Sequence, residues 1–209
     1  MKLIFLGPPG AGKGTMAKKL AADQGLAHIS TGDLFREAIA KATALGQKVK
    51  AIIEKGDLVP DGVTIELVRD RIAAKDCARG FILDGFPRTI PQAEALEDLV
   101  KVNAAVNFAL SDAEVIRRLS GRRLCPGCGR TFHVEFMPPE VPDICDSCGA
   151  GLIIRKDDQI DSIKNRLAVY TAQTEPLIGF YTERKLLKNV DSAPPPPEVF
   201  AALKKVLSL

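Results

Sequence analysis

The sequence contains no tryptophan, and aromatic side chains make up only 5% of its 209 residues. Proteins that bind single-stranded nucleic acid stack bases on exposed aromatic side chains and carry clustered basic residues. This chain has a net charge of only +3. The composition therefore argues against a nucleic-acid partner. Because so small a net charge cannot attract an anionic ligand by itself, any such ligand must be held by locally clustered arginines.

Long apolar runs are also missing. No window approaches the roughly 20 apolar residues of a membrane-spanning helix. The apolar N-terminal run, Met1–Leu6, is followed at once by Gly7-Pro8-Pro9-Gly10, and it is shorter than a secretory signal requires. We therefore expect a soluble cytoplasmic protein with no membrane partner.

Short apolar segments alternate with segments of helical periodicity, which predicts an α/β fold with a parallel five-stranded sheet and helices on both faces. We expect strands at residues 2–6, 26–30, 81–83, 104–110 and 186–190. We expect helices at residues 13–23, 31–42, 47–55 and 61–74, from Pro91 onward, and from the proline run 194–197 to Leu209. Thr31 is the expected N-cap of the second helix. Ligands of parallel sheets bind beyond the carboxyl ends of the strands, where Gly7, Thr31 and Asp84 lie.

The glycine-rich segment Gly7–Thr15 follows the first predicted strand and opens the first predicted helix, which is the context of a phosphate-binding loop. Its backbone N–H groups would face an anion, and Lys13 would reach the β- and γ-phosphates of a nucleotide. The usual motif has Ser or Thr directly after the lysine, whereas here Gly14 intervenes and the hydroxyl is on Thr15. This departure favours a Mg²⁺ ion held largely through water near Asp84.

Four of the five cysteines form two CxxC pairs, Cys125 with Cys128 and Cys145 with Cys148, in a turn-rich segment of residues 121–158. This spacing is typical of a structural zinc site with four thiolates, which leaves no open position for catalysis. A redox pair is the alternative. The fifth cysteine, Cys77, is expected to be a small buried side chain.

Several segments resemble the signature segments of adenylate kinases. They are Gly7–Thr15, Ser30–Asp33, Asp84–Thr89, Gly121–Arg123, Arg155–Asp158 and Pro176–Ile178. The similarity extends from Met1 to about Val199, and the inserted segment is similar to the long-lid bacterial type. The resemblance implies a monomer with a P-loop NTPase-like core that catalyses the reversible, Mg²⁺-dependent reaction ATP + AMP = 2 ADP. It implies a core of residues 1–29, 60–120 and 159–209, an AMP-binding segment of residues 30–59, and a zinc-binding lid of residues 121–158.

The resemblance also implies roles for individual residues. The catalytic residues would be Lys13, Arg88, Arg122, Arg155 and Arg166. Of these, Arg122, Arg155 and Arg166 would surround the transferring phosphoryl group, while Arg88, with Arg36, would grip the phosphate of AMP. ATP would contact Gly10, Ala11, Gly12, Lys13, Gly14, Thr15, Arg118, Arg122, Thr131 and Phe132. AMP would contact Thr31, Gly32, Arg36, Ile53, Gly56, Asp57, Leu58, Val59, Gly85, Arg88, Gln92, Arg155 and Arg166. Magnesium would be held through water by Asp84 and Asp33.

The reaction implied by the resemblance needs no general base, and the sequence offers no catalytic acid–base arrangement. The AMP phosphate, with a second pKa near ~6, is mostly a dianion at neutral pH, so the acceptor needs no general base. No Ser-His-Asp arrangement is found. Of the two histidines, His28 is expected in the core or its rim and His133 near the ATP ribose. The closest alternative is a kinase for UMP, CMP or GMP, against which Gln92 and Thr31 favour adenine. A zinc-knuckle nucleic-acid binding protein with a nucleotide-dependent switch is a second alternative of another class.

Overall fold

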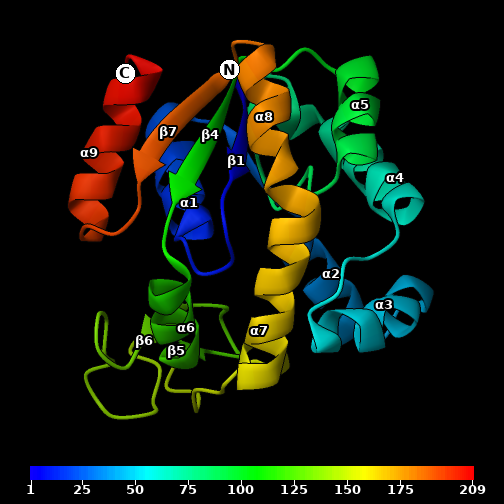
Figure 1. Cartoon of the computed structure of the whole chain (residues 1–209). Helices are drawn as coiled ribbons and strands as arrows, with labels where there is room; N and C mark the ends of the chain where they lie inside the picture. The colour runs from blue at the N-terminus through cyan, green and yellow to red at the C-terminus, as the bar shows by residue number, and fades with distance from the viewer.

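The computed structural model describes residues 1–209, and its centre is a five-stranded sheet with the strand order β2-β3-β1-β4-β7 (Figure 1). The strands are β1 (Lys2–Leu6), β2 (Ala27–Ser30), β3 (Phe81–Asp84), β4 (Ala104–Ala109) and β7 (Leu187–Asp191). All four neighbouring pairs are parallel. The predicted parallel sheet is therefore confirmed, and each strand boundary lies within one residue of its prediction.

Helices cover both faces of this sheet because successive strand residues point to opposite sides. The helices are α1 (Lys13–Gln24), α4 (Asp61–Ile72), α5 (Ile90–Leu99), α8 (Pro176–Glu183) and α9 (Pro196–Leu207). Ile4 and Leu6 of β1 belong to the core beneath α4, α5 and α8, whereas Leu3 and Phe5 belong to the core beneath α1 and α9. Burial on both faces explains why the strands read as continuous apolar runs.

The helices α2 (Thr31–Ala40) and α3 (Ala44–Lys55) form a separate pair after β2. The expectation that Thr31 caps α2 is wrong. Ser30 is the N-cap, because its side chain accepts a hydrogen bond from the Asp33 N–H at 3.2 Å, while the Thr31 hydroxyl donates to the Gly85 carbonyl at 2.7 Å. Helix α3 begins three residues before its predicted start, because the Thr43 hydroxyl caps it.

Residues 121–158 form the irregular insert that the sequence predicts, between α6 (Asp112–Ser120) and α7 (Ile160–Val169). The insert contains the antiparallel hairpin β5 (Arg122–Leu124) and β6 (Thr131–His133) and ends in the 3-10 turn η2 (Lys156–Asp158). Helices α6 and α7 pack through their own small apolar cluster. In Figure 1 this hairpin lies on one side of α7, and α2 and α3 lie on the other.

Two further turns complete the chain. They are the 3-10 turn η1 (Lys75–Cys77) and the π turn η3 (Tyr170–Thr174), which joins α7 to α8. Cys77 is 4% exposed, as expected for a small buried side chain. Helix α9 starts with prolines in its first turn, as predicted, but it ends at Leu207 because Ser208 adopts a positive φ of 58°. None of the helices has both the length and the apolar character needed to cross a membrane.

Candidate active site

The glycine-rich loop turns sharply from β1 into α1. Gly10 and Gly12 have φ values of +81° and +79°, in the left-handed region that favours glycine. Gly12 is the N-cap of α1, and no side chain caps the helix there. The uncapped helix N-terminus therefore leaves backbone N–H groups and the positive end of the helix dipole for an anion.

Lys13, the first residue of α1, folds back over this loop. Its Nζ donates hydrogen bonds to the carbonyls of Gly7 and Pro8, both at 2.7 Å. Burial, together with nearby arginines including Arg88, lowers the pKa of Lys13 to about 8 against the opposing effect of the Asp84 charge. Lys13 therefore lies among the predicted phosphate-binding arginines, although Arg88 is far away in sequence.

Two carboxylates hold three of these arginines in place. The fully buried side chain of Asp158 accepts hydrogen bonds from Arg122 Nε at 2.7 Å and from Arg166 Nη1 at 2.9 Å. Asp157 accepts one from Arg155 Nε at 2.9 Å. Burial by itself would raise the pKa of Asp157, but the positive charges of Arg155 and Arg166 hold it at about 2. Three guanidinium groups face two carboxylates, so the cluster keeps an excess positive charge for a phosphate.

A smaller pocket lies between α2, α3 and the strand end of β3. It is lined by all thirteen residues predicted to contact AMP. Three further lining residues were not predicted: Phe35, Thr64 and Asp157. Helical spacing could have identified Phe35, one turn after Thr31 on the same face of α2. No sequence signal pointed to Thr64, whose hydroxyl donates to the Val59 carbonyl at 3.4 Å.

Gln92 lies in the wall of this pocket with only 2% of its surface exposed. Its Oε1 accepts a hydrogen bond from the Arg88 N–H at 2.8 Å, and its Nε2 donates to Asp61 Oδ1 at 2.7 Å. An amide has two N–H donors and two oxygen lone pairs, so one of each remains for the edge of a base. The neighbouring Arg88 is held in turn by its Nε, which donates to the Gly85 carbonyl at 2.9 Å.

A larger cleft extends from the glycine-rich loop to the insert. It is lined by Gly10, Gly12, Lys13, Gly14, Thr15, Arg118, Arg122, Thr131 and Phe132. Ala11 is the one predicted ATP residue that does not line it, because Ala11 is fully buried beneath the loop. The cleft is also lined by residues that the sequence did not predict, among them Phe136, Met137, Tyr170, Thr174 and residues 193–196. The last group could have been found, because it directly follows a strand of the parallel sheet.

Arg118 and His133 stand at the insert side of this cleft. Arg118 Nε donates to Glu114 Oε1 at 2.9 Å, and its Nη2 donates to the Ala193 carbonyl at 3.0 Å. His133 Nδ1 accepts a hydrogen bond from the Phe136 N–H at 3.1 Å, and the two rings lie 4.4 Å apart. Both side chains thus have fixed positions on the cleft wall before any ligand is bound.

The two cavities share four arginines: Arg36, Arg88, Arg155 and Arg166 line both the smaller pocket and the larger cleft. Anions bound in the two cavities would therefore meet the same guanidinium groups. The shared guanidinium groups are therefore where the protein can neutralise a phosphate in one cavity and a phosphate in the other at the same time.

Asp84, at the end of β3, faces the glycine-rich loop. A Cβ atom at position 14 would lie 3.1 Å from Asp84 Oδ2, so Gly14 leaves the space in front of this carboxylate open. It is paired with no lysine or arginine, and its one ionic partner is His28 Nε2 at 3.5 Å. Asp33 lines the same cleft, but its carboxylate is paired with Arg36 at 2.5 Å. Asp84 therefore has free oxygen lone pairs for the waters of a hydrated Mg²⁺ ion, whereas Asp33 has fewer.

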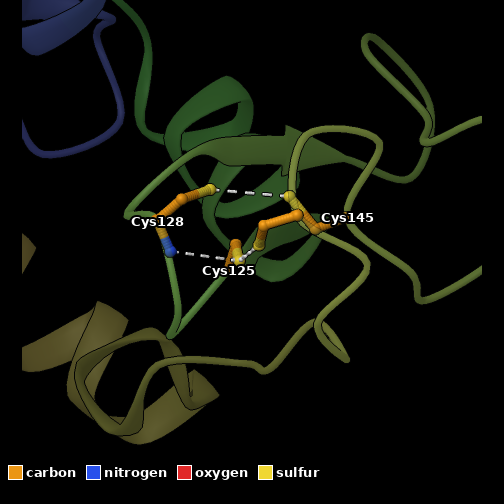
Figure 2. A group of neighbouring side chains, drawn as sticks. Cys125, Cys128 and Cys145 are labelled. Carbon is orange, nitrogen blue, oxygen red and sulfur yellow. Dashed lines mark hydrogen bonds between the residues drawn. The ribbon is translucent and has the colours of Figure 1, made fainter.

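The four cysteines of the insert come together, as the spacing predicts. Figure 2 shows Cys125, Cys128 and Cys145 pointing toward one another. The sulfur atoms of all four, including Cys148, lie within 4.8 Å of one another. Tetrahedral zinc with bonds of ~2.3 Å sets its sulfur ligands about 3.8 Å apart. The closest sulfur pairs, at 3.3 and 3.6 Å, are too distant for disulfide bonds of ~2.05 Å.

The backbone around the two cysteine pairs follows one repeated pattern. The N–H of Cys125 donates to the Arg130 carbonyl at 2.9 Å, and the Cys145 N–H donates to the Ala150 carbonyl at 2.9 Å. Gly129 and Gly149, one residue after each second cysteine, have φ values of +73° and +72°. Each turn directs both sulfurs of its pair to one point, and the N–H of Cys128 lies 3.5 Å from Cys125 Sγ. That contact, together with hydrogen bonds from the other cysteine side chains, lowers the pKa of Cys125 to about 6 and favours its thiolate.

Comparison with known proteins adds an independent finding. A family model described as "Adenylate kinase" matches residues 5–186. Among curated proteins, the adenylate kinase of Treponema denticola is 55% identical over 204 residues, which cover 98% of each chain. The adenylate kinase of Lachnospira eligens is 52% identical and covers 99% of this chain and 100% of its own length. The adenylate kinase of Methanocella arvoryzae is 48% identical and covers 99% of this chain and 98% of its own length.

Proposed function

The chain belongs to the adenylate kinase family, and from this membership we propose how its residues carry out the reversible, Mg²⁺-dependent reaction ATP + AMP = 2 ADP. The observation that carries the proposal is the set of arginines shared by the two cavities. Arg36, Arg88, Arg155 and Arg166 line both, so two nucleotides bound there would place their phosphates against the same cations. The smaller pocket is the proposed AMP site and the larger cleft the proposed ATP site.

The proposed chemistry is positioning and charge stabilisation. Backbone N–H groups at the start of α1 and the Lys13 ammonium bind the β- and γ-phosphates. Arg88 grips the AMP phosphate, while Arg122, Arg155 and Arg166 stabilise the charge on the transferring group. The AMP phosphate attacks without a base because it is already a dianion, with a second pKa near ~6. The cluster of cations thus takes the place of an acid–base pair.

Magnesium accompanies ATP in adenylate kinases and, when bound, neutralises charge on the β- and γ-oxygens. The residues present fit such an ion, because Asp84 lines the cleft and its carboxylate is paired with no lysine or arginine, only with His28 Nε2 at 3.5 Å. We assign Asp84 as the main partner of the magnesium waters. Asp33 takes a smaller part, because Arg36 already binds its carboxylate.

The cysteine cluster is proposed to hold a structural zinc ion. All four positions of a tetrahedral site are sulfur, so no position remains for a substrate or a reactive water. The apolar core of the insert consists of only Cys125, Phe132 and Cys145, with Ala150 and Leu152 packed against it. So small a core cannot stabilise the segment by itself, and the metal would supply the missing free energy.

The division into mobile parts is also a proposal. Residues 30–59 would close over AMP and residues 121–158 over ATP, while residues 1–29, 60–120 and 159–209 form the core. Closing both segments would exclude water, which otherwise competes with AMP for the phosphoryl group. A monomer acting in the cytoplasm completes the proposal.

An acceptor panel tests the proposal. The purified protein is incubated with Mg-ATP and AMP, UMP, CMP or GMP in turn, and the formation of both diphosphates is followed. We expect ADP to form only in the presence of AMP. The donor control contains Mg-ATP without an acceptor and reports hydrolysis by water. Phosphorylation of UMP in preference to AMP would overturn the assignment of the smaller pocket.

A further inference from the structure

Ser192 directly follows β7, yet its side chain reaches the glycine-rich loop that follows β1. Its hydroxyl donates a hydrogen bond to the main-chain carbonyl of Ala11, which lies 181 residues earlier. Ser192 is 2% exposed and Ala11 is fully buried. Strands β7 and β1 are not neighbours, because β4 lies between them. The hydrogen bond therefore joins two loops across the carboxyl edge of the sheet.

The Ser192 hydroxyl is the only protein donor to this carbonyl. No main-chain N–H and no other side chain hydrogen-bonds to it. A trans peptide is planar, so the Ala11 carbonyl and the Gly12 N–H point in opposite directions. Gly12 is the N-cap of α1, lines the larger cleft, and has the backbone freedom of a glycine with φ at +79°. By fixing the Ala11 carbonyl, the Ser192 hydroxyl therefore also fixes the orientation of the Gly12 N–H at the start of the anion-binding helix.

The loop that carries Ser192 is itself anchored. The Ser192 N–H donates to the Ala109 carbonyl at 3.0 Å, so the residue continues the register of the sheet past β7. The carbonyl of Ala193 accepts a hydrogen bond from Arg118 Nη2 at 3.0 Å. Residues 193–196 then line the larger cleft. Ser192 thus lies at the end of β7. Its side chain contacts the glycine-rich loop, and the residues that follow it line the cleft.

We propose that Ser192 is a positioning residue for the donor nucleotide, which orients the Gly12 N–H toward the ATP phosphates through the Ala11 carbonyl. The inference rests on the proposed assignment of the larger cleft as the ATP site. Ser192 does not touch the nucleotide in this role. Without the hydroxyl, the Ala11–Gly12 peptide loses its only fixed partner and can rotate, because glycine tolerates a wide range of backbone angles. The peptide must then be ordered each time ATP binds, which makes the free energy of binding less favourable.

The test compares Ser192→Ala with the wild-type protein by calorimetric titration in the absence of Mg²⁺ and with AMP at saturation. The two titrants are ATP and inorganic tripolyphosphate, which can engage the phosphate loop but carries no base. We expect Ser192→Ala to weaken both by the same factor, about tenfold, as expected for the loss of one hydrogen bond to a buried carbonyl. The affinity for AMP, titrated alone, is expected to change less than twofold.

Two further variants separate positioning from simple packing. Ser192→Cys keeps a side chain of similar shape with a weaker donor, so its affinity for tripolyphosphate should lie between those of Ser192 and Ser192→Ala. Thr182→Ala removes a comparable hydroxyl-to-carbonyl hydrogen bond, to Ile178 in α8 at 2.6 Å, and should leave every affinity unchanged. Thermal unfolding of each variant checks that the protein is folded during titration.

The outcomes are distinct. Equal tripolyphosphate affinity in wild type and Ser192→Ala, with ATP weakened, would place the effect on the cleft wall at residues 193–196 and overturn the inference. Unchanged affinity for both titrants would overturn it as well. Failure of the wild-type protein to bind ATP or tripolyphosphate would instead contradict the proposed ATP site itself.

Discussion

Asp158 and Arg122 are 36 residues apart in sequence, and Arg122 Nε donates to Asp158 Oδ2 at 2.7 Å. The Asp158 side chain is fully buried and also accepts from Arg166 Nη1 at 2.9 Å. One carboxylate thus holds two arginines, Arg122 from β5 at the start of the insert and Arg166 from α7. The position of both guanidinium groups in the cleft therefore depends on a residue that no nucleotide needs to touch.

The first prediction concerns this carboxylate. Asp158→Asn keeps the shape of the side chain but removes the charge that compensates Arg122 and Arg166. We expect kcat to fall about 10- to 100-fold, because the two arginines lose their fixed geometry. The free energy of unfolding should fall by about 3 kcal/mol, as for other buried ion pairs that lose one partner. Steady-state kinetics and urea denaturation measure the two effects.

The matched control is Asp76→Asn. Asp76 also pairs with an arginine, Arg71, but 57% of its side chain is exposed. Solvent screens such a pair, so this variant should change stability only slightly and leave kcat unchanged. Equal, small effects in both variants would contradict the positioning role of Asp158.

The second prediction concerns Arg88, which lines both cavities. Arg88→Lys keeps the positive charge but loses the two-pronged guanidinium and the hydrogen bond to the Gly85 carbonyl. We expect kcat/KM for AMP to fall about 100-fold, equivalent to ~2.7 kcal/mol of transition-state stabilisation. ATP binding should change much less. The control is Arg184→Lys at the surface pair with Glu97, and retention of full AMP activity in Arg88→Lys would refute the assigned role.

The third prediction concerns pH. Burial lowers the pKa of Lys13 to about 8 in the free protein, and a bound phosphate would raise it, because it favours the charged ammonium. ATP binding then takes up a proton above pH 8, so the ATP affinity should fall as pH rises, by on the order of tenfold per pH unit at most. Between pH 7.5 and 8, where Lys13 is still at least half protonated, the affinity should fall by less than about twofold.

Calorimetric titration of ATP from pH 7.5 to 10 checks this dependence. The control is Lys13→Arg, whose guanidinium stays charged throughout this range, so its ATP affinity should show no such decline. A flat profile in the wild-type protein would show that Lys13 keeps its charge to higher pH than burial predicts.

The fourth prediction concerns the cysteine cluster. Cys128→Ser removes one of four thiolates, so we expect the bound zinc to fall well below one ion per chain and the unfolding temperature to drop. Some phosphoryl transfer should remain, because no open coordination position takes part in the chemistry. Metal analysis and calorimetry measure these effects. Cys77→Ser is the control and should keep the full zinc content, since Cys77 lies outside the insert.

Complete loss of phosphoryl transfer in a folded, zinc-free Cys128→Ser protein would contradict a purely structural metal. Removal of the metal from the wild-type protein by a chelator should give the same pattern as the substitution. A stable, fully active protein after chelation would show instead that the insert folds without zinc.

Local patterns in the sequence determined much of what the structure shows. The five strands were predicted to within one residue because strands buried on both faces must be apolar throughout. The glycine-rich loop was identified because positive φ angles at Gly10 and Gly12 require glycine. The cysteine spacing identified the cluster because a metal site of this kind is built from two short turns. The N-cap of α2 was predicted at Thr31 instead of Ser30, because both residues carry a hydroxyl that can cap a helix.

Long-range relationships were decided by the tertiary structure. Nothing in the local sequence indicates that the Thr31 hydroxyl binds Gly85, that Gln92 is held by Asp61, or that Ser192 reaches Ala11. The sequence by itself determined the parts: a phosphate loop, a set of arginines and a cysteine insert. Only the packed structure decided which arginines line both cavities, because the cavities are assembled from segments that are far apart in the chain. It also decided that Arg122 is held by Asp158, 36 residues away.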